Sequence, residues 1–120
     1  MIRGVRGATT VIEDSNELVL QETRRLVEEM AKLNSISPED IASVIISTTM
    51  DITSAFPARA VRGLEGWAYV PVMCTHEMNV PGALEKCIRL LMHVNTDKSQ
   101  QEVQHVYLNN AVQLRPDLLK

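Results

Sequence analysis

The sequence predicts an α+β fold in which a mixed sheet of about five strands packs on one long helix. Residues 15–33 repeat apolar side chains at helical spacing. Several shorter runs, rich in β-branched and apolar residues and separated by polar turns, are typical of strands. A chain of 120 residues is large enough for one core, so we expect residues 1–120 to form a single domain.

The first half of the chain opens with a strand over residues 2–11, whose glycines let another backbone or a ligand approach closely. Ser15 is expected to cap the long helix, which runs to about Leu33. The buried stripe of this helix contains Val19, Thr23, Leu26, Val27, Met30 and Leu33. A second strand is expected over residues 42–48, where β-branched side chains dominate.

The second half begins with a short helix over residues 55–62, which Gly63 ends. Residues 74–78 are expected to form a loop that leaves the third strand. The strands expected here cover residues 67–73, 87–94, and 106–108 with 111–114 as a final strand or bent pair. Because one long helix covers only one face of such a sheet, self-association is the economical way to cover the other face.

Arg89 interrupts the otherwise apolar run of residues 87–94. In a strand, the even-numbered side chains of this run share one apolar face and Arg89 lies on the other. A guanidinium keeps its charge, so a partly buried one needs an anionic or polar partner. The run contains no acid, and the partner is therefore either a distant carboxylate or a ligand anion.

Composition and charge exclude several classes of protein. The net charge of −3 argues against a general binder of nucleic acid or acidic membranes. The chain has neither an apolar run long enough to span a membrane nor the apolar centre of a signal peptide near its start. Two cysteines make no disulfide framework, so a reduced, cytoplasmic protein is expected. The three histidines show no ligand spacing with the cysteines, and no metal is expected.

Five arginines fall in or beside the strands and short loops: Arg6, Arg59, Arg62, Arg89 and Arg115. Because a guanidinium binds carboxylates through two parallel hydrogen bonds, this placement suggests a pocket for a small polyanion. The alternative is that each arginine pairs with one of the 15 acids of the chain. No phosphate loop, dinucleotide fingerprint or Ser-His-Asp set is present. These features fit a binding module, or an enzyme that works by positioning and electrostatics.

Glu77 and Cys74 both follow the expected third strand, and each has more than one interpretation. Glu77 could accept a hydrogen bond from a substrate hydroxyl, or could be a solvated loop acid. Cys74 is more simply a small buried apolar residue than a nucleophile, since nothing nearby in the sequence would activate it.

An ordered set of motifs covers nearly the whole chain. It comprises RGxRGATTV at 3–11, FPARAVR at 56–62, GWxYVPV at 66–72, CxxEMxVPG at 74–82, KCIRLLM at 86–92, HVYL at 105–108 and LRPDL at 114–118. This set resembles the AroH-class chorismate mutases, the small monofunctional α/β type. The resemblance implies a homotrimer whose sheets and helices form a pseudo-α/β barrel, with three active sites in clefts between subunits.

The activity that the resemblance implies is the Claisen rearrangement of chorismate to prephenate, on the branch toward phenylalanine and tyrosine. This reaction is unimolecular and pericyclic, and it uses no covalent intermediate and no cofactor. Its substrate is a dicarboxylate, which agrees with the number of arginines outside the long helix.

The resemblance also assigns roles to residues. Arg89 would face the ether oxygen, Arg6 would bind a substrate carboxylate, and Glu77 with Cys74 would meet the ring hydroxyl. Tyr107 would contact the enolpyruvyl carboxylate. The other expected contacts are Phe56, Ala58, Met73 and Leu114 in the cleft, and Arg62 and Arg115 at its mouth. Arg59 stands where lysine is familiar, which keeps the charge but changes its reach.

Three other interpretations fit the same arginines. They are a non-catalytic sensor that binds carboxylates, a trimeric imine or enamine deaminase, and a structural oligomer in which every arginine is paired internally. Loss of chorismate absorbance on adding the protein would separate a chorismate mutase from all three.

Overall fold

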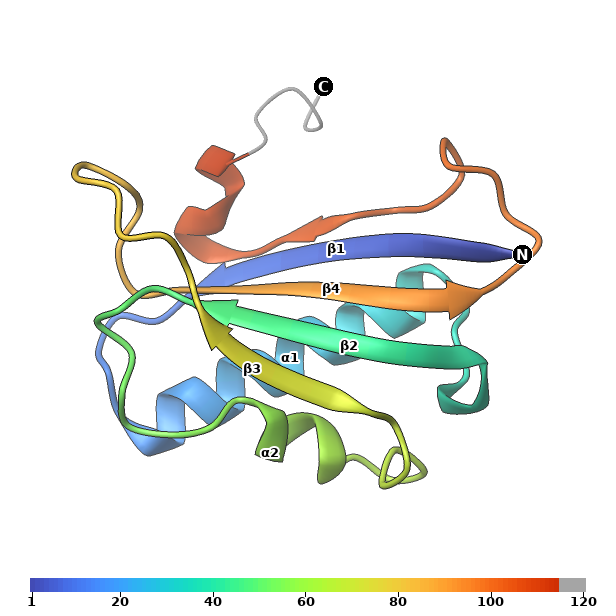
Figure 1. Ribbon diagram of the computed structural model, residues 1–120, viewed down its shortest axis with the longest axis horizontal. Coiled ribbons are helices and arrows are strands. Elements are labelled where there is room, and N and C mark those ends of the chain that lie inside the picture. Colours follow the sequence, from blue (N-terminus) through green and yellow to red (C-terminus); the bar gives the residue numbers. More distant parts are fainter. Residues whose placement is uncertain (115–120) are drawn as a thin grey trace.

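The computed structural model describes residues 1–114 of the chain. One five-stranded sheet has the order β3-β2-β4-β1-β5 (Figure 1). Its strands are β1 (Ile2–Thr10), β2 (Ile41–Thr48), β3 (Val72–His76), β4 (Cys87–Asn95) and β5 (Val106–Tyr107). β4 runs antiparallel to β1 and β2, whereas the outer pairs β1–β5 and β2–β3 are parallel. The predicted mixed sheet of about five strands is therefore confirmed.

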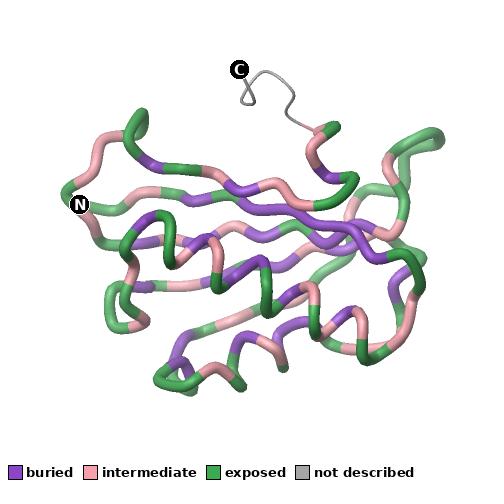
Figure 2. The backbone as a smooth tube through the Cα atoms, turned by 180° about the vertical axis from the view of Figure 1, so that it is seen from behind, coloured by how far each residue is buried: buried purple, intermediate pink, exposed green. Residues whose placement is uncertain are grey.

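Helices α1 (Asn16–Leu33) and α2 (Ala58–Arg62) lie on the same face of the sheet (Figure 1). The bounds of the long helix and its cap agree with the prediction, since Ser15 Oγ accepts a hydrogen bond from the Leu18 N–H at 3.1 Å. The predicted burial of Leu33 is wrong, because this last residue of the helix is 40% exposed. Short 3-10 helices, η1 (Pro38–Asp40) and η2 (Asn109–Leu114), precede β2 and follow β5. Seen from behind, buried residues recur along the strands and at intervals along the helices (Figure 2).

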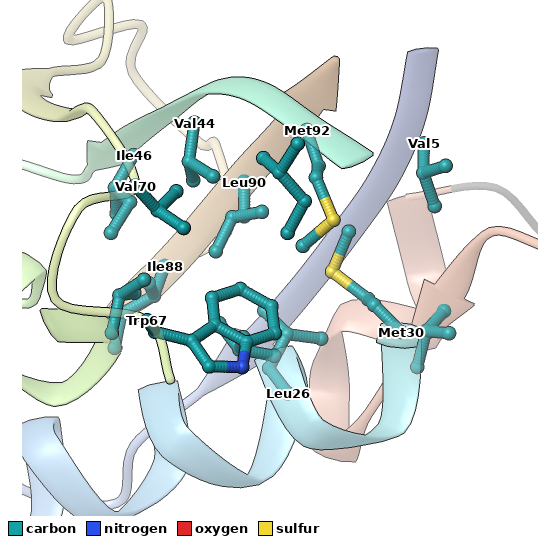
Figure 3. Packing of buried hydrophobic residues seen from close by; sticks show 14 of the residues in the cluster. Val5, Leu26, Met30, Val44, Ile46, Trp67, Val70, Ile88, Leu90 and Met92 are labelled. Atoms are coloured by element: carbon teal, nitrogen blue, oxygen red, sulfur yellow. The ribbon is translucent and has the colours of Figure 1, made fainter. Parts of the chain in front are cut away.

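The hydrophobic core fills the space between α1 and the even-numbered side chains of β4. Ile88, Leu90 and Met92 are at most 3% exposed, and they point toward Leu26 and Met30 of α1 (Figure 3). The apolar alternation of this strand therefore builds the core, as expected from its period of two.

Gly7 determines how closely α1 approaches β1. A Cβ atom at Gly7 would overlap the sulfur of Met30 and would lie 3.0 Å from Leu26 Cδ1. The glycine thus allows two core side chains of the helix to rest directly on the strand backbone. The sequence suggested the close approach of another backbone or a ligand, whereas the structure places side chains of the helix there.

No helix of the described residues covers the opposite face of the sheet (Figure 1). Arg6 of β1, Ile45 of β2, Met73 of β3 and Arg89 of β4 point to this side, because alternate side chains of a strand share a face. We call it the open face. Met73 is 68% exposed and Ile45 is 39% exposed, so the open face carries apolar surface.

The expected third strand over residues 67–73 is wrong in its bounds, because β3 covers Val72–His76. Trp67 and Val70 are both buried, whereas Tyr69 between them is 98% exposed. This spacing of three belongs to a turn, in which the Val70 N–H donates to the Trp67 carbonyl at 3.1 Å. The loop expected from Cys74 is also wrong, since Cys74 lies within β3.

Two further boundaries differ from prediction. The short helix starts at Ala58 rather than at residue 55. The ring of Pro57 clashes with the backbone of Phe56 in a helical conformation, so the helix does not extend back through Phe56. Residues 111–114 form part of η2 and not a strand. Asn109, with a φ of 55°, turns the chain out of the sheet. Its side-chain nitrogen donates to the Thr10 carbonyl at 2.9 Å and holds that turn.

In residues 1–114 no helix combines the length and apolar character needed to cross a membrane.

Candidate functional site

A cavity of about 170 Å³ opens on the open face, near the carboxyl ends of β1 and β2 and the start of β4. Its wall includes four residues that the sequence singled out: Arg6, Glu77, Arg89 and Tyr107. The other lining residues are Gly7, Ala8, Ile45, Ser47, Leu90 and Leu91. The fold therefore brings together residues from opposite ends of the chain, such as Arg6 and Tyr107.

Arg89 and Glu77 form an ion pair in this cavity. Arg89 Nη1 donates to Glu77 Oε2 at 3.1 Å, and the side chains are 44% and 28% exposed. The partner that the apolar strand lacked is thus a distant carboxylate, one of the two options left open by the sequence. Because both groups remain accessible, the pair contributes little to stability and leaves guanidinium donors for a ligand.

Arg6 supplies a second cation to the same cavity. No carboxylate of the described residues forms an ion pair with its guanidinium. Two guanidinium groups therefore share the cavity with one carboxylate, Glu77, and the surplus positive charge favours an anionic ligand. The backbone N–H of Arg6 donates to His105 Nδ1 at 2.9 Å.

Sequence reasoning missed Ser47 and Ala8, which flank Arg89 across the sheet. In the strand register Ser47 of β2 and Ala8 of β1 both pair with Arg89. Ser47 Oγ also donates to Glu77 Oε2 at 3.4 Å. A period-two pattern marks both residues as open-face positions, but only the order β2-β4-β1 places them beside Arg89.

Three other predicted residues line a different cavity of about 470 Å³, at the β3 edge of the sheet. They are Phe56, Arg59 and Cys74, and Phe56 is 72% exposed there. Cys74 pairs with Ile46 and faces the helical side of β3, away from the open face. Within one chain the predicted site residues are therefore divided between two surfaces.

The remaining predicted residues lie elsewhere. Ala58 is buried at the start of α2, and Arg62 is exposed at its end. Met73 lies on the open face beside Ile45 but lines neither cavity. Leu114 lines a broad groove of about 1060 Å³ between the start of α1, residues 82–86 and η2. Arg115 lies outside the described residues.

Cys87 begins β4 two residues before Arg89, and it is 2% exposed. Burial raises the pKa of its thiol to about 11, against a smaller opposing effect of the Arg89 charge. The side chain is therefore a neutral thiol at physiological pH and behaves as a small apolar residue. Across residues 1–114 there is no cluster of three or more histidine, cysteine or acidic side chains suited to a metal ion.

An α+β domain with one uncovered sheet face, and with a cavity there that holds two arginines, a glutamate and a tyrosine, is suited to a small anionic ligand. The family described as chorismate mutase type I has a sequence profile that matches residues 2–118. The chain belongs to this family, whose members are isomerases, and chorismate mutase activity is the function that follows from membership.

Individual relatives agree with the profile. The chain is 52% identical over 118 residues to chorismate mutase AroH of Bacillus subtilis, covering 98% of this chain and 93% of the relative. It is 50% identical over 119 residues to chorismate mutase AroH of Thermus thermophilus, covering 98% and 97%. A chorismate mutase structure from Clostridium thermocellum has a TM-score of 0.88 and 48% identity, covering 91% of this chain and 96% of that one.

Proposed function

We propose that the open-face cavity is where this protein rearranges chorismate to prephenate, in the synthesis of phenylalanine and tyrosine. The observation that carries the proposal is the meeting of Arg6, Glu77, Arg89 and Tyr107 in one small cavity. Two cations suit an anionic substrate, and a carboxylate beside them suits a hydroxyl group. The rearrangement needs no nucleophile and no cofactor, so polar groups that position the substrate and stabilise its charge are suited to it.

In the proposed mechanism Arg89 stabilises the ether oxygen, on which negative charge grows as the C–O bond breaks. The guanidinium is held in place before the reaction by Glu77 at 3.1 Å, so little reorganisation is needed in the transition state. Glu77 in turn accepts a hydrogen bond from the ring hydroxyl. Because Arg89 uses one donor on Glu77, its other donors remain for the substrate.

Arg6 and Tyr107 bind the substrate carboxylates and favour the compact conformer in which the reacting carbons meet. They lie on neighbouring parallel strands, with Ala8 and Tyr107 in register. This arrangement holds two anion-binding groups at a fixed separation, and such positioning removes entropy from the barrier.

We further propose a homotrimer in which each site is completed by a second copy of the chain. The open face supports this, because Ile45, Leu91 and Met73 would otherwise leave apolar surface in water. The division of the predicted residues supports it as well. Phe56, Arg59 and Cys74 line the edge cavity of one chain and could close the open-face cavity of the next.

The test of the activity is loss of chorismate absorbance on adding the purified protein, with prephenate identified as the product. An Arg89→Ala variant that keeps its secondary structure should lose most of this activity. Carboxylate binding without turnover by the unmodified protein would contradict the proposal and favour a sensor. An Arg89→Ala variant as active as the parent would show that the reaction occurs elsewhere.

We propose that residues 1–120 form one chorismate mutase domain that works in the cytoplasm. A single cluster of buried residues contains members from α1, α2, β1, β2, β4 and β5, which supports one domain. Both cysteines are free thiols, which supports a reducing compartment.

A further inference from the structure

The histidine that precedes β5 is bonded to the backbone of a proposed site residue. His105 Nδ1 accepts a hydrogen bond from the Arg6 N–H at 2.9 Å. A ring nitrogen that accepts has no hydrogen of its own, so this imidazole is neutral and carries its hydrogen on Nε2. The side chain is half-buried, and the cavity lies at the same strand pair.

The imidazole accepts a hydrogen bond that a backbone carbonyl would accept in a regular parallel sheet. In a regular parallel ladder with Ala8 opposite Tyr107, the Arg6 N–H would bond to the carbonyl of Gln104. That carbonyl instead accepts from Asn34 Nδ2 at 2.8 Å. The histidine ring therefore replaces a missing ladder bond at the start of a strand that is only two residues long.

Asn34 fixes the other side of this segment. Its Oδ1 accepts from the Gln104 N–H at 2.7 Å, so the amide makes two bonds to one residue. Asn34 is buried at the end of α1, and its position is set by the core. The chain that enters β5 is thus held to the helix at Gln104 and to β1 at His105, just before it reaches Tyr107.

We propose that His105 is a positioning residue for chorismate binding: its bond to the Arg6 backbone sets the spacing between Arg6 and Tyr107. This inference rests on the proposed function, because it takes both residues as ligands of the substrate carboxylates. Arg89 and Glu77 do not depend on the β1–β5 pair, since β4 bonds to β1 and β2. Loss of the histidine should therefore impair substrate binding more than the bond-breaking step.

The expected kinetic signature is a split between KM and kcat. Losing one hydrogen bond that orders both carboxylate ligands should raise KM about ten-fold, which corresponds to about 1.4 kcal/mol and lies within the usual range for one hydrogen bond. The kcat should stay within about three-fold of the parent value, because Arg89 keeps its place. A general loss of folding would instead lower the apparent kcat in proportion to the unfolded fraction and leave KM unchanged.

Three substitutions test the position of the acceptor. In His105→Asn, the side-chain oxygen can occupy the place of Nδ1, and KM should return to within about three-fold of the parent value. In His105→Gln, the oxygen lies one bond farther out, so KM should stay raised by about ten-fold. His105→Leu removes the acceptor and should resemble the glutamine variant. Because asparagine and glutamine are both polar, their difference isolates the position of the acceptor from polarity.

The matched control is Gln104→Ala, which removes an exposed side chain from the same segment but keeps its backbone bonds to Asn34. Its KM and kcat should equal those of the parent protein. Equal KM values for the asparagine and glutamine variants would overturn the proposal, as would a folded His105→Leu variant with the parent KM. If Arg6→Ala leaves KM and kcat unchanged, the proposed function fails in its placement of Arg6. That result is distinct from failure of the His105 variants alone.

Discussion

At the residue scale, Arg89 combines a structural and a chemical role. The sequence left its partner as either a distant carboxylate or a ligand anion. The structure places Glu77 at 3.1 Å, so the carboxylate is present. The pair is partly exposed, which makes it weak as a source of stability but useful as an ordered donor. A half-exposed ion pair in a cavity that also contains Arg6 is better explained by ligand binding than by folding.

Replacing Arg89 with lysine should lower kcat by about two orders of magnitude, because one electrostatic donor to a developing oxyanion is worth about 3 kcal/mol. An ammonium group is a compact point charge and cannot bond to Glu77 and the substrate in the same plane. Steady-state kinetics on chorismate would measure the loss. Arg24→Ala is the matched control, since Arg24 lies on α1 with a 64% exposed side chain and pairs only with Glu28 among the described residues. Near-normal turnover of the lysine variant would remove Arg89 from its proposed role.

Cys87 should be inert to thiol reagents in the folded protein. Its pKa of about 11, raised by burial, keeps it protonated at neutral pH, so reagent consumption should come from Cys74. A raised pKa means that the folded state binds this proton more tightly than the unfolded state does. The resulting stability is present below pH 9.0 and is lost as pH rises toward 11.

The measurement is thiol titration with and without denaturant. A Cys74→Ser variant should consume almost no reagent until it is unfolded. Rapid reaction of Cys87 in the native Cys74→Ser protein would contradict its buried, neutral state.

At the element scale, α1 packs closely against β1 because Gly7 of β1 has no side chain. Gly7 and Gly4 lie on the same strand, yet their side-chain positions face opposite sides of the sheet. A Cβ atom at Gly7 would meet the core side chains Met30 and Leu26, whereas one at Gly4 would meet only Leu91 Cδ1, at 3.5 Å. The two glycines therefore provide an internal comparison.

Gly7→Ala should destabilise the fold by about 1–3 kcal/mol, the usual cost of overpacking a core. Met30 is fully buried, so its sulfur cannot move aside without displacing other side chains. Gly4→Ala should change stability by less than about 1 kcal/mol, since the new contact is an ordinary one. Urea unfolding of both variants would measure the difference. Equal stabilities would mean that α1 can shift away from β1 freely.

The segment between β2 and α2 is tied to the start of α1 by one carboxylate. Asp14 accepts hydrogen bonds from the backbone and side chain of both Thr53 and Ser54, at 2.7 to 3.2 Å. The bond from the Ser54 hydroxyl is the main reason that the pKa of Asp14 is lowered from 3.8. These bonds fix the segment that leads to Phe56 and Arg59 of the edge cavity.

Asp14→Ala should cost about 1–2 kcal/mol at neutral pH, because several hydrogen bonds to a charged group are lost at a partly exposed site. The folded-state pKa lies below the unfolded value, so this stabilisation is present above 3.8 and fades as pH falls through the folded pKa. Urea unfolding of the parent and the variant at neutral pH and well below pH 3.8 would reveal this. A stability difference that persists at the lower pH would contradict the role of the charge.

At the scale of the whole molecule, one chain divides its expected site between two surfaces. Arg89 lines the open-face cavity, and Arg59 lines the edge cavity on the far side of β3. In the homotrimer that we propose, a site that uses both arginines would draw them from two copies of the chain. The uncovered sheet face provides the surface on which those copies could meet.

Subunit mixing tests this arrangement. Arg89→Ala and Arg59→Glu proteins should each be nearly inactive. The first substitution removes a positive charge from every site, and the second replaces a positive charge with a negative one in every site. After they are unfolded together and refolded, some interfaces should combine an intact Arg89 with an intact Arg59, and part of the activity should return. The control is each variant refolded alone. If mixing restores nothing while mixed oligomers are present, both arginines act from the same chain or Arg59 is not in the site.

Local patterns predicted the bounds of α1, β1, β2 and β4 within about one residue. The periods of a helix and of a strand can be recognised from the order of apolar and polar residues along the chain. Local patterns were wrong for Trp67–Val70, where apolar residues in a turn imitate a short strand. They were also wrong after Asn109, where a single left-handed residue redirects the chain. Turns of this kind depend on contacts with distant residues, and such contacts leave no periodic signal.

The sequence by itself determined the long helix, the apolar side of β4, the unusual position of Arg89 and membership of the chorismate mutase family. Each of these depends on residue type and spacing along the chain. Tertiary structure alone decided that Glu77 is the partner of Arg89, that Ser47 and Ala8 flank it, and that His105 holds the Arg6 backbone. The physical reason is that these contacts follow from strand order and register, which bring together groups far apart in sequence.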